Sequence, residues 1–322
     1  MRNPQISIII PCYNCEELVA ETLESLMSQT YKDFEVICVN DGSKDQTAEI
    51  LEKWKAKNLF PMQVLHQENG GVSRARNAGI MIAKGQYILF LDADDCYHEE
   101  FIERLYNALR ESNADISYCM LSRNKDTVRK AVIAENNWFT MQQQPAFMHN
   151  LLYKMPQFGF YCYLYKADVL RENNILFDVN TAYFEDREFN WKYLCHCQTA
   201  AYVDAPLYWY RVNEKSVTQN KTVCWRIDDI GAVIRVEEYL QKSNCVFYPE
   251  LKSYLLARVL WSKAMHYAVG KRKDLFDKLR DEYDVKAGMR RTAKDNNILV
   301  ALASWFYLIY PMLFFWTVGM KR

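Results

Sequence analysis

Short apolar runs alternate with amphipathic segments along the first 95 residues of the chain. The runs are rich in Ile, Val and Leu with few polar residues between, which predicts strands of a sheet covered on both faces. In the amphipathic segments apolar residues recur every three or four positions, which predicts helices. Strands are expected at residues 6–10, 34–39, 64–66 and 86–91, and helices at 18–28, 47–54 and 74–83. This order predicts an α/β fold with a doubly wound, mostly parallel, Rossmann-like sheet.

The pattern changes after this region. Residues 114–120 predict a further strand, and the polar stretch 123–144 predicts a loop or insertion. Two more short strands are expected at 201–204 and 207–211. Residues 158–165 are densely aromatic, which favours a packed core over a sugar-binding face. From residue 221 the periodicity is helical, over 227–240, 251–269 and 275–283, which predicts a C-terminal helical region.

The strand predicted at 86–91 ends in three carboxylates, those of Asp92, Asp94 and Asp95. Carboxylates this close repel one another unless a cation offsets their charge. Oxygen ligands suit a hard ion such as Mg²⁺ or Mn²⁺, which proteins commonly share with substrate phosphates. A lone Asp-x-Asp is more often a solvated turn, so the case for a metal site depends on the other strand ends.

The carboxyl ends of parallel strands gather at one edge of a sheet, where ligands bind. Tyr13 and Asp41 follow the first two predicted strands, so we expect them near the carboxylates after the fourth. Together these groups predict a nucleotide site. The aromatic ring could stack on a base, a carboxylate could accept from a base N–H or a ribose hydroxyl, and a metal could bind a diphosphate. Alone, Tyr13 could be a surface tyrosine and Asp41 a turn residue. No Gly-x-Gly-x-x-Gly follows the first strand and no Walker lysine is present, which excludes dehydrogenase and P-loop phosphate binding.

The charge is balanced overall, with 40 Lys and Arg against 40 Asp and Glu, which argues against a nucleic-acid binder. The two parts of the chain differ, however. Residues 1–220 carry 22 basic and 29 acidic residues, whereas residues 221–322 carry 18 and 11. The start of the sequence leads directly into a strand without a signal peptide, so the ten cysteines are expected in a reducing cytoplasm.

The segment 296–320 contains no charged residue, and 298–318 is apolar nearly throughout. Its length would permit a membrane span. Pro311 interrupts it, however, aromatic residues are scattered along it, and basic residues flank both ends. These features favour a peripheral or monotopic helix at the cytoplasmic face of a membrane, lying in the interface or bent. A core helix of a soluble protein is the alternative.

Four segments in this order resemble family 2 glycosyltransferases of the GT-A fold. They are 6–14 (Ile-Ser-Ile-Ile-Ile-Pro-Cys-Tyr-Asn), 39–43 (Val-Asn-Asp-Gly-Ser), 70–79 (Gly-Gly-Val-Ser-Arg-Ala-Arg-Asn-Ala-Gly) and 91–95 (Leu-Asp-Ala-Asp-Asp). The resemblance implies a nucleoside-diphosphate sugar as donor, with a UDP-sugar expected, a Mn²⁺ or Mg²⁺ ion, and transfer with inversion.

The resemblance also implies roles for individual residues. Tyr13 and Asp41 would hold the base, Asp92 would face the ribose, and Asp94, with Asp92, would ligate the metal. The helix that carries Arg76 and Asn77 would pack beside the donor, although a purely structural role for both is an equal alternative. Arg211 would contribute positive charge at the phosphates. Many members of the family have a histidine in the loop that follows, which this sequence lacks, so a third metal ligand from the protein is in doubt. The full set expected at the donor is Pro11, Tyr13, Asn14, Glu17, Asp41, Arg76, Asn77, Asp92, Ala93, Asp94 and Arg211.

Glu185 and Asp186 resemble the acidic pair of this family in which the Asp is the catalytic base. Inverting transfer needs a group that removes a proton from the acceptor hydroxyl as it attacks, and a carboxylate can do so. Asp186 is therefore the expected base, and Glu185 would orient the acceptor. The alternative is a pair of ordinary acids at a helix start.

The sequence thus predicts a metal-dependent glycosyltransferase that acts on a glycan or lipid-linked oligosaccharide in surface polysaccharide synthesis. Residues 1–115 would bind the donor, 116–220 the acceptor, and 221–322 would form the helical region, whose segment 296–320 contacts the membrane. The oligomeric state is open, and a homo-oligomer is compatible with the sequence. The rivals are a non-catalytic nucleotide-sugar scaffold, which would lack a usable base, and a nucleotidyl- or phosphotransferase, which would need a basic phosphate loop near the first strand.

Overall fold

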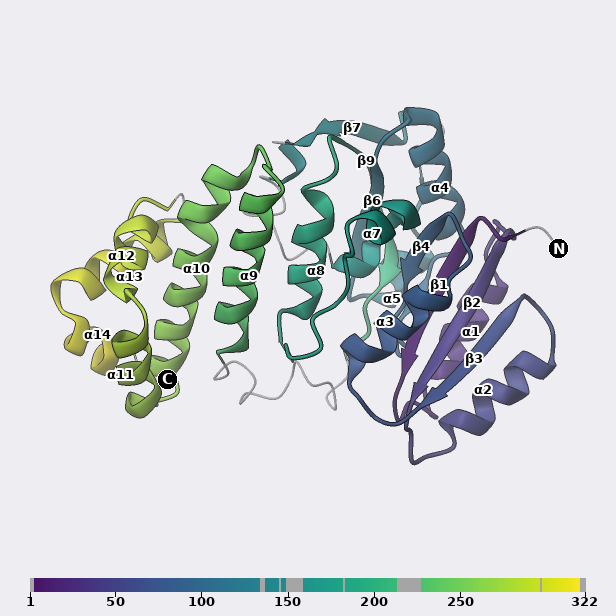
Figure 1. The fold of residues 1–322 in the computed structure, drawn as a ribbon, viewed down its shortest axis with the longest axis horizontal. Helices are drawn as coiled ribbons and strands as arrows, with labels where there is room; N and C mark the ends of the chain where they lie inside the picture. The colour runs from purple at the N-terminus through teal and green to yellow at the C-terminus, as the bar shows by residue number, and fades with distance from the viewer. Residues whose placement is uncertain are drawn as a thin grey trace. The chain divides into compact units, whose positions relative to one another are not determined.

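A computed structural model describes residues 3–133, 137–144, 146–148, 159–181, 183–212, 227–295 and 297–318. The chain divides into two compact units, Met1–Val212 and Asn213–Arg322 (Figure 1). The first is an α/β unit and the second is a helical unit. The assignment of residues 1–115 to the donor and 116–220 to the acceptor stays a prediction.

The α/β unit is built on a mixed sheet of nine strands in its described part, ordered β3-β2-β1-β4-β8-β6-β9-β5, with β7 paired to β9. The first four strands are parallel neighbours, as are β6 and β9, whereas β8 runs antiparallel to both β4 and β6. The predicted fold class is confirmed. The strands are β1 (Ile6–Cys12), β2 (Phe34–Asp41), β3 (Met62–Gln67), β4 (Tyr87–Phe90), β5 (Cys96–Tyr97), β6 (Ile116–Ser122), β7 (Phe139–Gln143), β8 (Tyr163–Lys166) and β9 (Thr199–Trp209).

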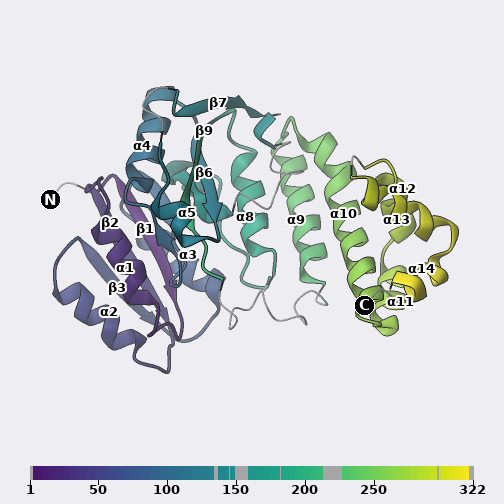
Figure 2. The same ribbon diagram turned by 180° about the vertical axis from the view of Figure 1, so that it is seen from behind.

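Helices cover both faces of the parallel strands, which is why β1 and β2 are buried almost throughout. Figures 1 and 2 show α3 on one face and α1 on the other. Gly79 lets α3 approach β1 closely, because a Cβ there would lie 2.4 Å from Cγ2 of Ile9. The helices are α1 (Val19–Met27), α2 (Thr47–Ala56), α3 (Val72–Ile82), α4 (Phe101–Ser112), α5 (Lys125–Arg129), the 3₁₀ turn η2 (Phe160–Cys162), α7 (Ala167–Glu172) and α8 (Glu185–Leu194).

Two local predictions need correction: the loop alternative for 123–144 and the division of 201–211 into two strands. The stretch 123–144 is not simply a loop, since it contains α5 and β7. The strands expected at 201–204 and 207–211 form the single strand β9. Pro206 lies inside that strand, at an irregularity in its register with β6 between Cys119 and Leu121. A bulge tolerates a proline that a regular ladder would exclude, so the proline did not end the strand.

The aromatic segment belongs to the core, as predicted, except that Phe158 lies outside the described residues. Phe160 and Tyr165 are buried and contact Phe90 of β4 with ring centroids 5.6 and 5.7 Å apart. Phe177 and Phe189 stack on each other with ring centroids 4.1 Å apart, and both contact the ring of Phe90 edge-on, at 5.3 and 5.5 Å. This aromatic cluster packs the start of α8 against the end of β4.

The helical unit contains the helices predicted from the periodicity. In its described part they are α9 (Asp228–Lys242), α10 (Tyr248–Val269), α11 (Lys273–Glu282), α12 (Val285–Thr292), α13 (Ile298–Ile309) and α14 (Pro311–Val318). The apolar segment at 298–318 breaks between α13 and α14, because Pro311 cannot donate the helical hydrogen bond. Within the described residues no helix combines the length and apolarity that crossing a membrane would require.

Candidate active site

The loops after β1 and β2 are tied together, as expected for neighbouring parallel strands. The backbone N–H of Asn14 donates to Oγ of Ser43 at 3.0 Å, and the N–H of Lys44 donates to Oδ1 of Asn14 at 2.8 Å. Asn14 has φ +47°, a left-handed conformation that asparagine tolerates well. This turn leaves the predicted base-stacking residue Tyr13 49% exposed. Pro11 is half-buried at the end of β1, and Glu17 is exposed beyond the turn.

Asp41 is buried at the end of β2 and organises the loop that precedes α3. Its Oδ1 accepts from Nε2 of Gln67 at 2.7 Å and from the N–H of Gly70 at 2.8 Å, and its Oδ2 accepts from the N–H of Gly71 at 2.8 Å. Gly71 has φ +86°, where a side chain would be strained. Asp41 thus holds the loop in place at the strand edge; a contact with a nucleotide base stays a prediction.

The three carboxylates after β4 have different surroundings. Asp95 is 1% exposed, and its oxygens accept from the hydroxyl of Tyr208 at 2.7 Å and from the N–H of Arg211 at 2.8 Å. Burial raises the pKa of Asp95 well above its usual range, and the charges of Asp92 and Asp94 raise it further. Asp95 therefore anchors the turn, a role that the sequence did not assign to it. Asp92 and Asp94 are half-buried.

Two further contacts position this turn. Ala93 is buried and its carbonyl accepts from Oγ1 of Thr22 at 2.9 Å. Nε of Arg211 donates to the carbonyl of Asp94 at 2.7 Å, and its guanidinium also pairs with Glu21 of α1. Arg211 thus lies beside the predicted metal ligand. Glu21 was missed because it is 190 residues away in the sequence, and no local pattern distinguishes it from other helix-surface acids.

Arg76 of α3 joins the strand end to the start of α8. Its Nη2 donates to Oδ1 of Asp92 at 2.8 Å and its Nη1 donates to Oε1 of Glu185 at 3.3 Å. The guanidinium lies over the ring of Phe160, 4.4 Å from its centroid, and the whole residue is 4% exposed. Despite burial, the carboxylates of Asp92, Glu185 and Asp186 raise its pKa, so the charge is retained. One buried cation therefore brings the predicted donor residue and the predicted acidic pair together.

Asn77, the next residue on α3, uses its amide for a structural contact. Its Nδ2 donates to the carbonyl of Phe177 at 2.8 Å and its Oδ1 accepts from the N–H of Phe177 at 2.9 Å. This pair of bonds fixes the segment before α8 to α3. The contact matches the structural alternative for Asn77, while contact with the donor stays a prediction.

The acidic pair lies at the first turn of α8. The preceding residue, Phe184, has φ +82°, which is rare for a bulky side chain and is tolerated when the surroundings fix it. Burial and the charge of Asp186 raise the pKa of Glu185, Arg76 opposes them, and the net result is a pKa of about 7. Glu185 thus lies in an environment that disfavours its charge, which is common for functional carboxyl groups.

The raised pKa of Glu185 predicts how the free energy of unfolding changes with pH. A carboxyl whose pKa is higher in the folded than in the unfolded chain weakens folding as the pH rises from about 4.5 to above 7. We expect Glu185→Gln to raise the free energy of unfolding at pH 8 by at most about 3 kcal/mol and to leave it nearly unchanged at pH 4.5. Urea unfolding of the ligand-free protein at both pH values measures this difference. The exposed Glu172→Gln on α7 is the control and should show no such pH dependence; equal stability of Glu185→Gln and wild type at pH 8 would contradict the prediction.

The residues at the strand edge fit a metal that takes most of its ligands from a substrate. Among the described residues no group of three or more His, Cys, Asp or Glu could hold an ion alone. Asp95 is 1% exposed and accepts from Tyr208 and Arg211, whereas Asp92 and Asp94 are half-buried. Asp92 also pairs with Arg76, so a hard cation here would draw on Asp92 and Asp94 together with groups of a substrate. Mg²⁺ and Mn²⁺ are commonly held by one or two carboxylates together with substrate phosphates and water.

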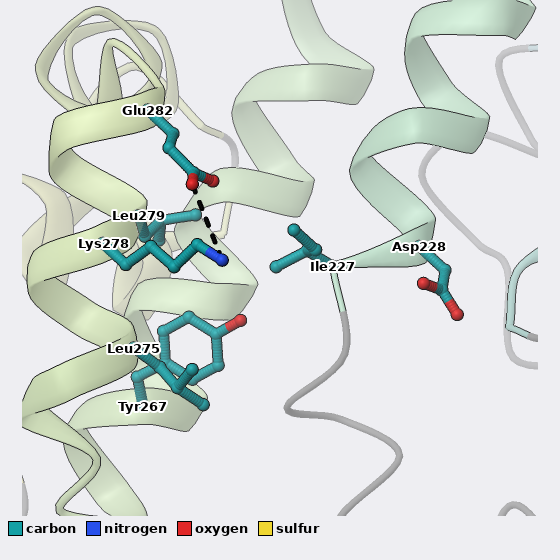
Figure 3. A pocket seen from close by; sticks show the side chains of 7 residues that line it. All are labelled: Ile227, Asp228, Tyr267, Leu275, Lys278, Leu279 and Glu282. Carbon is teal, nitrogen blue, oxygen red and sulfur yellow. Dashed lines mark ion pairs between the residues drawn. The ribbon is translucent and has the colours of Figure 1, made fainter.

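A pocket of about 220 Å³ occurs elsewhere, in the helical unit (Figure 3). It is lined by apolar side chains such as Leu275 and Leu279, by Tyr267, and by the ion pair between Lys278 and Glu282 at 3.6 Å. None of the residues predicted to bind a donor or to act as a base lines it. It therefore does not replace the strand edge as the candidate active site.

Two relatives match part of this chain in sequence. A 219-residue stretch, 67% of this chain, is 35% identical to the uncharacterized glycosyltransferase EpsJ of Bacillus subtilis, of which it spans 63%. A 189-residue stretch, 58% of this chain, is 38% identical to a poly(ribitol-phosphate) beta-glucosyltransferase of Bacillus spizizenii, of which it spans only 28%.

Solved structures share the fold. The crystal structure of S. aureus TarS 1–349 in complex with UDP-GlcNAc has a TM-score of 0.71 at 20% identity, with 98% of this chain and 90% of that chain covered. The mannosyltransferase PcManGT from Pyrobaculum calidifontis, in complex with GDP-Man and Mn²⁺, has a TM-score of 0.56 at 15% identity. The match covers 97% of this chain and 89% of that chain. The sequence model of glycosyl transferase family 2 matches residues 7–173, which include every segment of the proposed donor site except Arg211. The chain belongs to glycosyl transferase family 2.

Proposed function

We propose that this glycosyltransferase moves a sugar, with inversion, from a nucleoside-diphosphate sugar to a hydroxyl group of a cell-surface glycan or lipid-linked oligosaccharide. The observation that carries the proposal is the position of Arg76, which pairs with Asp92 on the donor side and Glu185 on the acceptor side. A transferase must hold donor and acceptor next to each other, and one buried guanidinium links the residues proposed for both.

In this proposal Tyr13 and Asp41 hold the base of the donor and Asp92 faces its ribose. Asp94, with Asp92, would hold a Mg²⁺ or Mn²⁺ ion, which when bound neutralises charge on the leaving diphosphate. Arg211, held at the carbonyl of Asp94, adds positive charge on the same side. A UDP-sugar is the proposed donor, and the UDP-GlcNAc bound to TarS supports this choice.

Asp186 is the proposed base. It lies at the N-terminus of α8, close enough to raise the pKa of both Glu185 and Arg76 through its charge. The acceptor hydroxyl would lose its proton to Asp186 while its oxygen attacks the anomeric carbon opposite the diphosphate. Glu185, held by Arg76, would orient the acceptor.

The relatives that act on poly(ribitol-phosphate) support a hydroxyl of a surface polymer as the acceptor. We place the enzyme at the cytoplasmic face of the membrane, where a lipid-linked acceptor would be presented. A homo-oligomer remains compatible with this arrangement. The rival is a scaffold that binds a nucleotide sugar without transferring it; the paired acids at the start of α8 argue against it.

Metal dependence provides the test. Purified protein is incubated with UDP-, GDP- and dTDP-sugars, with membrane lipid extract as the acceptor source, and release of the nucleoside diphosphate is measured with Mn²⁺, with Mg²⁺ and with EDTA. We expect release from one class of donor, loss of release in EDTA, and recovery when the metal is restored.

Asp94→Asn should raise the metal concentration for half-maximal rate at least about tenfold, because it removes one charged ligand. The exposed Asp168→Asn on α7 is the control. A rate that is unaffected by EDTA would contradict the metal assignment, and binding of a donor without release in any condition would favour the scaffold.

A further inference from the structure

The end of the helical unit presents apolar side chains to the outside. On α13 the exposed apolar positions recur at helical spacing, and α14, which follows the break, carries further exposed apolar residues. Figure 1 shows both helices near the C-terminal end of the chain. We call this surface the α13–α14 apolar face. Its main residues, exposed by 48–73%, are Ile298, Leu299, Leu302, Trp305, Leu313 and Trp316.

The polarity of α13 is the reverse of that expected for a helix that faces water. Its serine, Ser304, is fully buried, and Oγ lies 2.7 Å from Oγ1 of Thr292 on α12 and donates to the carbonyl of Val300 at 2.7 Å. Tyr307 is also buried, at 1% exposed. The polar side chains thus face the protein, whereas large apolar ones face outward. A water-exposed helix has the opposite arrangement, so the outer face suits an apolar medium.

The length of α13 favours a helix in the plane of the interface. The 12 residues of α13 rise about 18 Å, against about 30 Å for the hydrocarbon core of a bilayer. Trp305 and Trp316 on the exposed face are residue types enriched at the boundary between lipid and water.

The adjacent helix carries charge suited to an anionic surface. Lys286, Arg290 and Lys294, in and just after α12, are exposed, and none of them pairs with a described carboxylate. Residues 221–322 carry 18 Lys and Arg against 11 Asp and Glu. Anionic headgroups would neutralise these cations. A second copy of the chain would instead add a second set of like charges, which argues against a dimer through this face.

We propose that the α13–α14 apolar face inserts into the interfacial layer of an anionic lipid bilayer, with the cations of α12 at the headgroups. This goes beyond the proposed transferase reaction and does not depend on it, because neither the donor nor the base takes part. The face would hold the enzyme at the surface on which a lipid-linked acceptor is found.

Vesicle flotation tests the proposal without an activity readout. The full chain is mixed with vesicles of phosphatidylglycerol and phosphatidylcholine, or of phosphatidylcholine alone. We expect flotation with the anionic vesicles that weakens as salt is added, and much weaker flotation with neutral ones. The double variant Leu302→Glu and Leu313→Glu should lower the partition coefficient at least about tenfold.

The matched control is the double variant Val246→Glu and Val269→Glu, which changes two exposed apolar residues of the same unit outside the face. It should float as wild type does. Brominated lipids should also quench tryptophan fluorescence less in a Trp305→Phe and Trp316→Phe variant. Failure of the wild-type chain to float with anionic vesicles would overturn the proposal. So would equal loss of flotation in both double variants, or a dimer in light scattering that Leu302→Glu and Leu313→Glu dissociates while vesicles are not bound.

Discussion

Asp186→Asn is expected to lower the rate of sugar transfer about 10²–10⁴-fold while the donor still binds. Asparagine keeps the size and hydrogen-bonding capacity of the side chain but cannot accept the proton of the acceptor hydroxyl. Because the substitution lies on the acceptor side, the dissociation constant of the donor should change little. Transfer is measured as release of nucleoside diphosphate in the presence of acceptor, and donor binding by calorimetry.

The control for this prediction is Asp168→Asn, which changes an exposed acid on α7 of the same unit. It should retain the wild-type rate. Glu185→Gln should reduce the rate less than Asp186→Asn, because Glu185 is proposed to orient the acceptor and not to take its proton. Asp186→Asn with unimpaired turnover and intact donor binding would remove Asp186 as the base and would require another group for proton transfer.

Arg76→Met is expected to cost about 3–5 kcal/mol of stability, because it leaves carboxylates at a buried site without their cation. The side chains of Asp92 and Glu185 are only 26% and 15% exposed, so water replaces the lost interaction poorly. Activity should fall at the same time, since the link between the donor and acceptor sides is lost. Urea unfolding of the purified variant measures the stability change.

A matched control and a rescue separate the ion pairs from general disruption of α3. Arg74→Met on the same helix is exposed and should change stability by no more than about 0.5 kcal/mol. Arg76→Met combined with Glu185→Gln should be more stable than the sum of the two single effects predicts, because one unpaired charge is removed. Arg76→Lys should lie between wild type and Arg76→Met, since an ammonium cannot reproduce the fork that contacts two carboxylates. Additive effects in the double variant would show that the pair between Arg76 and Glu185 does not contribute to the stabilisation.

The sequence by itself determined the class of fold and the family. Uninterrupted apolar runs ending in polar turns specify parallel strands with a common edge, and this physical constraint brought Tyr13, Asp41 and the turn at Asp92 to neighbouring loops. The motif segments identified the family because each has a fixed order and spacing along the chain. The helix break at Pro311 could also be predicted, since a proline cannot donate the helical hydrogen bond.

Only the tertiary structure decided how the charged groups share the site. Asp95, and not Asp94, is the buried member of its cluster. Its burial depends on Tyr208 and Arg211, which lie more than 110 residues away in the sequence. Arg76 reaches Glu185 across 109 residues, and such pairs leave no periodic signal in a single sequence. The rule that a proline ends a strand also failed at Pro206, because the pairing of β9 with β6 is irregular there and tolerates the proline. Likewise, the sequence showed that residues 298–318 are apolar, but only packing showed that Ser304 faces inward and leucines face outward, because the orientation of a uniformly apolar helix depends on its neighbours.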